Sequence, residues 1–179
     1  MNIVFLGPQG SGKSTQAELV SQHLKLPLLV IGDFLRSEAR KETSVGRRIA
    51  QLIKRGELIE DTLLVSLLKK ELVKEKYKGG LILDGAPRTL KQAYLFEPVL
   101  SVDQVVYLSI PDLVAYERLF KRGRFDDTPE LIKRRLEIYH DETDPVLSYY
   151  KKAGVLTTID GIPDVQTIFK EIVSKARLR

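Results

Sequence analysis

The chain of 179 residues has no cysteine and no tryptophan, one methionine and two histidines. Without cysteine, disulfide bonds and cysteine-ligated zinc are excluded. Its apolar runs are all far shorter than the roughly 20 residues of a transmembrane helix. The first residues lead directly into an apolar segment, without the basic region and cleavage site of a signal peptide. We therefore expect a soluble, cytoplasmic protein with no membrane partner.

Positive charge is in modest excess and is spread along the chain. The 29 Lys and Arg against 24 Asp and Glu give a net charge of +5, and the isoelectric point is about 9.3. Such a balance suits small polyanions as well as nucleic acids. No basic tail or nucleic-acid-binding signature accompanies the charge, so nucleic acid is not an expected partner. A hydrophobic content of 43% predicts a globular core.

Short apolar runs alternate with helical patterns along the chain, which is typical of parallel βαβ units. The expected strands are residues 3–6, 28–31, 81–83, 105–109 and 155–159. A last helix is expected over 165–176, where apolar residues recur on one stripe. The pattern predicts an α/β fold with three layers, in which helices flank a five-stranded parallel sheet.

Between the second and third expected strands lie three helical segments, 33–41, 44–55 and 61–75. Open α/β sheets bind ligands at the carboxyl ends of their strands, where a helical insertion can close over a substrate. The alternative is that these helices only thicken one side of the core.

A phosphate-binding motif follows the first expected strand. Residues 7–14 fit the pattern G-x-x-x-x-G-K-[ST], and a helical pattern comes next. The glycines allow the backbone to approach phosphate oxygens, and the helix N-terminus favours negative charge. Lys13 can then reach the β- and γ-phosphates, and a hydroxyl of Ser14 or Thr15 can bind Mg²⁺.

Asp84 ends the third expected strand, a position that suits an acid near Mg²⁺, bound directly or through water. By itself, an aspartate at a strand end is more often a turn former. Arginines are the second signal, because phosphoryl transfer needs cations positioned against phosphate charge. The candidates are Arg36, Arg88, Arg118, Arg122, Arg124 and Arg135. Any one of them by itself is more often part of a surface ion pair, so the arginines count as a signal only as a set.

Five segments in chain order resemble the adenylate kinase family of nucleoside monophosphate kinases, over nearly the full length. These segments are the phosphate-binding loop (7–17), the opening of the monophosphate subdomain (31–36), a strip that contacts the acceptor base (56–59), the most distinctive stretch (83–93) and the lid exit with its helix (123–136). GTP-binding switch proteins are excluded, because their N-K-x-D segment cannot occur in a chain whose one asparagine is Asn2.

The resemblance implies transfer of a phosphoryl group from Mg·ATP to AMP, which gives two ADP and needs Mg²⁺ but no zinc. It implies ATP binding by Gly10, Ser11, Gly12, Lys13, Ser14, Thr15 and Arg118. It implies AMP binding by Ile31, Arg36, Glu57, Leu58, Ile59, Gly85, Arg88, Gln92, Arg124 and Arg135. The implied catalytic residues are Lys13, Arg88, Arg122, Arg124 and Arg135, and the implied Mg²⁺ ligands are Asp84 and Ser14.

The resemblance also implies a single kinase domain over 1–179. Its core is expected at 1–30, 61–120 and 129–179, with a monophosphate-binding insertion at 31–60 and a vestigial lid at 121–128. With so short a lid, either the insertion or a neighbouring subunit must cover the site, so both a monomer and a homo-oligomer remain open.

One departure from the family pattern concerns the acceptor base. Ile31 stands where the family usually has threonine, and isoleucine cannot donate a hydrogen bond to the base. Gln92 still favours adenine, and a broad-specificity or pyrimidine nucleoside monophosphate kinase is the alternative.

Overall fold

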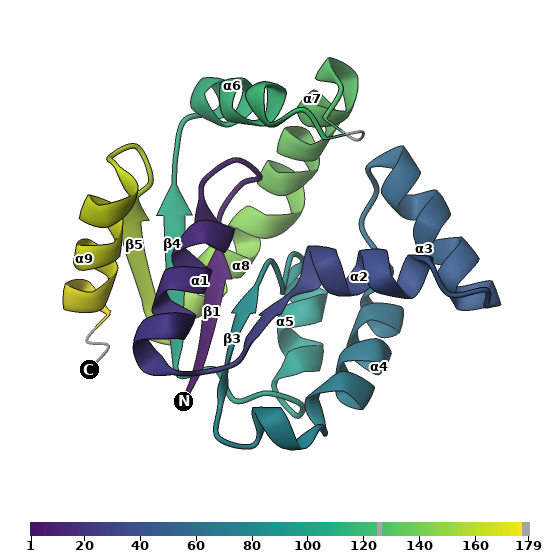
Figure 1. Cartoon of the computed structure of the whole chain (residues 1–179), viewed down its shortest axis with the longest axis horizontal. Helices are drawn as coiled ribbons and strands as arrows, with labels where there is room; N and C mark the ends of the chain where they lie inside the picture. Colours follow the sequence, from purple (N-terminus) through teal and green to yellow (C-terminus); the bar gives the residue numbers. More distant parts are fainter. Residues whose placement is uncertain (125–126, 177–179) are drawn as a thin grey trace.

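The structure is a computed structural model that describes residues 1–124 and 127–176. Its sheet is parallel throughout, with the strand order β2-β3-β1-β4-β5 (Figure 1). The described strands are β1 (Asn2–Leu6), β2 (Leu28–Val30), β3 (Leu81–Asp84), β4 (Gln104–Ser109) and β5 (Leu156–Asp160). The predicted three-layer α/β fold is confirmed.

Alternate residues of β1 face the two helical layers, as in a parallel sheet buried on both sides. Ile3 and Phe5 pack with the apolar residues of α1 (Lys13–Leu24) and α9 (Val165–Lys175). Val4 and Leu6 belong to the larger core on the opposite face. That core includes residues of α4 (Asp61–Leu72), α5 (Leu90–Phe96) and α8 (Asp144–Lys152). None of the described helices is long and apolar enough to cross a membrane.

The other helices gather near the carboxyl ends of the strands (Figure 1). They are α2 (Ile31–Ala39), α3 (Ser44–Arg55), α6 (Asp112–Arg122) and α7 (Pro129–Ile138). A one-turn 3₁₀ helix, η1 (Glu75–Tyr77), precedes β3, and a π-helical segment, η2 (Tyr139–Thr143), joins α7 to α8. In Figure 1 the arrows of β4 and β5 point toward the end of the molecule that carries α6 and α7, and α3 lies next to α2.

Several predicted boundaries were wrong by a few residues. β2 ends at Val30, and Ile31 starts α2, where its buried side chain packs in the same core as Leu35 one turn later. The helix predicted over 33–41 therefore covers Ile31–Ala39. The helix predicted over 61–75 ends at Leu72, and the last helix ends at Lys175. The helix predicted over 44–55 is confirmed.

The strand order determines where a ligand can bind. β1 and β3 are neighbours in the sheet, and the crossovers that follow them run in opposite directions: β1 leads to β2 on one side, and β3 leads to β4 on the other. Such a topological switch point opens a crevice at the carboxyl ends of the strands. In the register of the sheet, Phe5 of β1 is paired with Asp84 of β3, which is also paired with Val30 of β2. The last residue of β3 therefore lies at the edge of this crevice.

The entry into β3 yields a prediction about stability. Gly80 has a φ of +113°, and a Cβ there would lie 2.3 Å from the carbonyl oxygen of Met1. Gly79 has nothing within 4 Å of such an atom. We expect Gly80→Ala to lower the free energy of unfolding by about 3 kcal/mol, through backbone strain and overpacking. Gly79→Ala, the control, should leave it nearly unchanged in urea unfolding; equal effects of the two substitutions would contradict this close contact.

Candidate functional site

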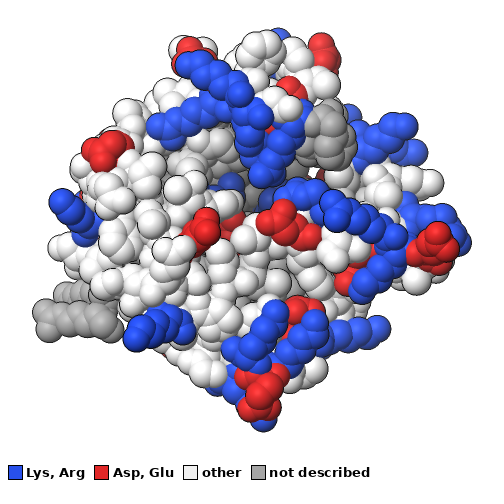
Figure 2. Space-filling model, viewed as in Figure 1, with Lys and Arg blue, Asp and Glu red and all other residues white. Residues whose placement is uncertain are grey.

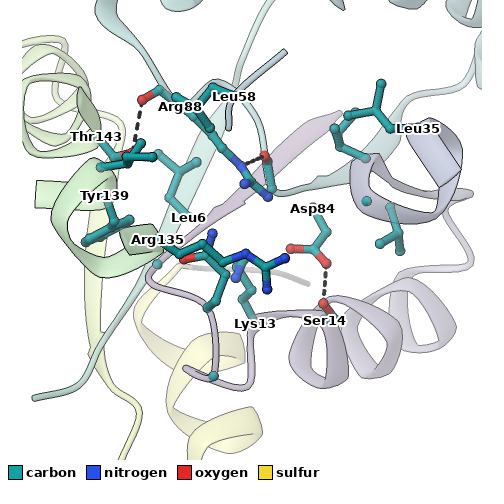
Figure 3. Close-up of a pocket in the computed structure, with 18 of the residues that line it drawn as sticks. Leu6, Lys13, Ser14, Leu35, Leu58, Asp84, Arg88, Arg135, Tyr139 and Thr143 are labelled. Atoms are coloured by element: carbon teal, nitrogen blue, oxygen red, sulfur yellow. Dashed lines mark hydrogen bonds between the residues drawn. The ribbon is translucent and has the colours of Figure 1, made fainter. Parts of the chain in front are cut away.

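A cavity of about 410 Å³ lies at the carboxyl ends of the central strands (Figure 3). Its volume is in the range typical of small-molecule sites. Its walls come from the loop after β1, from α2 and the segment after α3, from the segment after β3, and from α6, α7 and η2. All the site residues predicted from the sequence line this cavity except Ser11. Ser11 is fully buried, and its N–H donates to the carbonyl of Pro8.

The loop after β1 presents a helix N-terminus to the cavity. Gly12 is the N-cap of α1 and has a φ of 86°, a left-handed conformation that glycine adopts without strain. Within the described chain no side chain caps this helix, and its first turn carries no acidic residue. The N–H groups of the first turn and the helix dipole therefore favour an anion at this point.

Lys13 brings a positive charge into the cavity from the same turn. Its Nζ donates a hydrogen bond to the carbonyl of Pro8 at 3.1 Å. Burial lowers the pKa of the Lys13 amino group to about 8. Asp84 acts in the opposite direction, and Arg88 and Arg122 lower the pKa further. A bound anion would relieve this repulsion and favour the charged amine.

Asp84 and Ser14 form a pair of oxygen donors beside Lys13. Asp84 is 2% exposed, and its Oδ2 accepts a hydrogen bond from Ser14 Oγ at 2.5 Å. The other carboxylate oxygen, Oδ1, is buried and has no hydrogen-bond partner among the residues that the structure describes. A buried carboxylate oxygen without a donor is suited to a cation, because burial without a partner is unfavourable.

The segment after β3 holds Arg88 through its backbone and its side chain. Arg88 Nε donates to the carbonyl of Gly85 at 2.8 Å, and the Arg88 N–H donates to Gln92 Oε1 at 2.7 Å. Burial lowers the pKa of the guanidinium, Asp84 opposes this shift, and Arg135 and Arg36 add to it. Figure 3 shows Arg88, Arg135 and Lys13 converging on the space beside Asp84.

One buried carboxylate organises the arginines of α6 and α7. Asp127 accepts two hydrogen bonds from Arg122, at 2.8 and 2.7 Å, and lies 3.4 Å from Arg135 Nη1. It also accepts the backbone N–H of Arg124 at 3.2 Å. Burial by itself would raise the pKa of Asp127, but Arg122 and the other donors outweigh it and lower the pKa. Sequence reasoning missed this residue, because its role is to hold other side chains.

Arg36 on α2 and Arg118 on α6 also line the cavity. Arg36 is paired with Asp33, at 2.5 Å, and its guanidinium folds back over Gly32. Arg118 donates to the carbonyls of Gly161, at 2.9 Å, and Ile162, at 3.3 Å. The helix α6 thereby ties the loop after β5 to the cavity.

The segment after α3 contacts α7 directly. Glu57 forms an ion pair with Arg134 at 3.2 Å. A Cβ on Gly56 would lie 3.2 Å from Leu131 Cδ2, so the side chain of Leu131 packs closely against the backbone of Gly56. Of the predicted lid segment, Phe125 and Asp126 lie outside the described residues. Figure 2 shows that Lys and Arg side chains gather around the hollow in this face of the molecule.

The buried Asp127 yields a prediction for stability. We expect Asp127→Asn to lower the free energy of unfolding at pH 7 by about 2 kcal/mol, because charge-assisted hydrogen bonds are lost. The folded-state pKa lies below the ordinary 3.8. The contribution of the carboxylate is therefore present above pH 3.8 and is lost as the pH falls through the lower, folded-state pKa.

Urea unfolding at several pH values checks this prediction. Asp33→Asn, which breaks an ion pair whose aspartate is 70% exposed, is the matched control and should change little. If Asp127→Asn lowers the free energy of unfolding by the same amount in acid as at pH 7, the negative charge of Asp127 does not contribute to stability.

Comparisons with known proteins agree on one family. The family model for adenylate kinase matches residues 5–155. A protein of Prochlorococcus marinus named adenylate kinase is 39% identical, over 96% of this chain and 98% of its own. A Xylella fastidiosa adenylate kinase is 37% identical over 97% of each chain. A protein of Nostoc sp. named adenylate kinase 1 is 39% identical over 95% of each chain. The chain therefore belongs to the adenylate kinase family of nucleoside monophosphate kinases.

Proposed function

We propose that this protein transfers a phosphoryl group reversibly from Mg·ATP to AMP, giving two ADP. The observation that carries the proposal is the charge of the large cavity. Lys13 and six arginines line it, whereas the acids among its described lining residues are Glu57 and Asp84. Keeping so many cations close together in a half-buried site raises the free energy of the folded protein, and bound polyphosphates would offset this cost.

On the donor side, the loop after β1 binds the phosphates of ATP. Gly10, Gly12 and Lys13 line the cavity at the N-terminus of α1. Their N–H groups and the Lys13 ammonium contact the β- and γ-phosphates. Arg118, held by the carbonyls of Gly161 and Ile162, packs against the adenine.

Ser14 and Asp84 are the residues that would hold Mg²⁺, directly or through water. Mg²⁺ prefers oxygen ligands and is usually bound by one or two carboxylates together with substrate phosphates and water. The partnerless Oδ1 of Asp84 and the adjacent Ser14 hydroxyl fit this donor set. Among the described residues there is no group of three or more His, Cys, Asp or Glu that could hold a metal, as expected if the nucleotide supplies the remaining ligands. When bound, Mg²⁺ neutralises charge on the β- and γ-phosphates.

On the acceptor side, Arg36 and Arg88 grip the phosphate of AMP. Gln92 binds the base, and the orientation of its side-chain amide determines which base is preferred. Because Gln92 Oε1 accepts the N–H of Arg88, the amide nitrogen remains to donate toward the cavity. Adenine N1 accepts a hydrogen bond, whereas guanine N1 and uracil N3 carry hydrogen. The contact therefore favours adenine, and cytosine among pyrimidines.

Transfer itself needs little covalent chemistry from the protein. The attacking oxygen of the AMP phosphate is already anionic, so no general base is required. Arg122 and Arg135, held by Asp127, and Arg124 beside them stabilise the phosphoryl group as it moves. Because Asp127 fixes Arg122 and Arg135 in advance, little reorganisation is needed in the transition state.

The insertion over 31–60 provides the cover that the vestigial lid at 121–128 is too short to supply. The ion pair of Glu57 with Arg134 and the contact of Gly56 with Leu131 support this part of the proposal. Both contacts lie within one chain, so the cover does not require a neighbouring subunit.

The first prediction of this proposal concerns Arg88. We expect Arg88→Ala to lower kcat/KM for AMP by about 1,000-fold, because a charge-assisted phosphate contact is lost. Arg48→Ala is the matched control, since Arg48 pairs with Glu60 at 2.5 Å and does not line the cavity among its described residues. Coupled-enzyme assays of ADP formation measure both variants. Near-normal turnover of Arg88→Ala would show that this arginine does not hold the acceptor.

The second prediction concerns the acceptor and tests the proposal as a whole. Initial rates with Mg·ATP are compared for AMP, CMP, UMP, GMP and dAMP, with an acceptor-free control for hydrolysis. AMP should be the best acceptor, with GMP and UMP far poorer. Comparable rates on all five would favour the alternative, a broad-specificity kinase, with the apolar Ile31 as the cause. No ADP from any acceptor would overturn the proposal.

Gln92→Glu separates base reading from phosphate binding. The variant keeps an oxygen for the N–H of Arg88 but loses the N–H donors. We expect kcat/KM for AMP to fall by about 30-fold and the preference for AMP over GMP to narrow, because the carboxylate accepts from guanine N1–H. An equal loss on AMP and GMP would contradict the assigned orientation of the amide.

A further inference from the structure

We infer that Thr143 is a positioning residue for the acceptor phosphate, which acts through the backbone of Arg88. The inference rests on the proposed function and adds to it a residue that no sequence pattern singled out. Thr143 lines the cavity and is 3% exposed. Its Oγ1 donates a hydrogen bond to the carbonyl of Arg88 at 2.9 Å (Figure 3).

The backbone of Arg88 is held on both sides. Its carbonyl accepts from Thr143, and its N–H donates to Gln92 Oε1. The next residue, Thr89, is fixed as well, since it caps α5 through the N–H of Gln92 and donates to Asp61 at 2.8 Å. Thr143 therefore connects this network to η2, which continues directly from α7, the helix that carries Arg135.

The local sequence explains why Thr143 can reach Arg88. Thr143 is the last residue of η2, and Pro145 occupies the first turn of α8. Proline cannot donate to the carbonyl four residues earlier, so the regular hydrogen-bond ladder of an α-helix is interrupted there. A π-helical turn is wider than an α-helical one and often occurs at functional sites. Here it places Tyr139 and Thr143 together on the cavity wall.

The contact opposes a repulsion. Arg135 lies on α7, the helix directly before η2. Burial is the largest cause of the lowered pKa of Arg88, and the charge of Arg135 lowers it further. Two guanidinium groups that share a cavity tend to move apart when no anion lies between them. The bond from Thr143 ties the segment of Arg88 to the helix of Arg135. It thus sets the distance between Arg88, which binds the acceptor phosphate, and Arg135, which stabilises the transferred phosphoryl group. A small change in this distance would lower the rate of transfer.

The experiment removes the hydroxyl and keeps the shape. Steady-state kinetics of Thr143→Val, in both AMP and ATP, should show KM for AMP raised about tenfold, while KM for ATP changes by less than about twofold. Thr143→Ser, which restores the donor, should recover the KM for AMP. Thr157→Val is the matched control, since Thr157 on β5 accepts from Gln104 at 2.7 Å and does not line the cavity among its described residues.

A double-mutant cycle tests the route through Arg88. In the Arg88→Ala background, Thr143→Val should cause no further loss of kcat/KM for AMP. Additive losses, or equal changes in KM for AMP and ATP, would overturn the inference and leave a purely structural role. Thr143→Ala, judged by the same criteria, replaces the valine variant if the latter does not fold.

The two levels of the proposal fail in different ways. If the wild-type protein makes ADP and Thr143→Val behaves as wild type, the role of Thr143 falls while the proposed function stands. If the wild-type protein makes no ADP from Mg·ATP and AMP, both fall.

Discussion

Repulsion among like charges is the constraint on which the rest of this structure depends. Lys13 and six arginines share one cavity, and few of the described groups compensate them. Asp84 and Asp127 supply buried carboxylates, and the carbonyls of Pro8 and Gly85 accept from Lys13 and Arg88. The pKa of Lys13 is lowered mainly by burial, and Arg88 and Arg122 lower it further against the effect of Asp84. An anion bound in this cavity would favour the charged form of Lys13 and offset the repulsion among these cations.

The apolar layers are what make such a concentration of charge tolerable. The residues of β1 are almost completely buried, and both of its faces are covered by helices. This rigid sheet fixes the ends of β1 and β3, from which the phosphate loop and Asp84 emerge. The cations then arrive from separate elements, Arg36 from α2, Arg122 from α6 and Arg135 from α7. Because each of these arginines is anchored in a different packed helix, no single local movement can separate all of their charges.

Carboxylates and hydroxyls between these elements turn separate cations into one site. Asp127 links α6 to α7, Thr143 links η2 to the segment after β3, and Glu57 links the insertion to α7. All three links converge on the α7–η2 helix. The insertion is therefore connected through α7 to Arg135, which lies on that helix, and to Asp127, which holds Arg122. Preorganisation of this kind is the main means by which phosphoryl transfer is accelerated.

The sequence by itself determined the order of the elements, the phosphate-binding loop and the family, because these depend on local patterns and on motifs with fixed spacing. It also identified the cations of the cavity, through the resemblance. Only the tertiary structure decided that Ile31 begins a helix and that Ser11 is buried rather than lining the cavity. It also decided that Asp127 and Thr143 hold the arginines. Thr143 and Arg88 are 55 residues apart, and Arg118 and Gly161 are 43 apart. Contacts over such separations have no periodicity to reveal them, since they follow from how the layers pack.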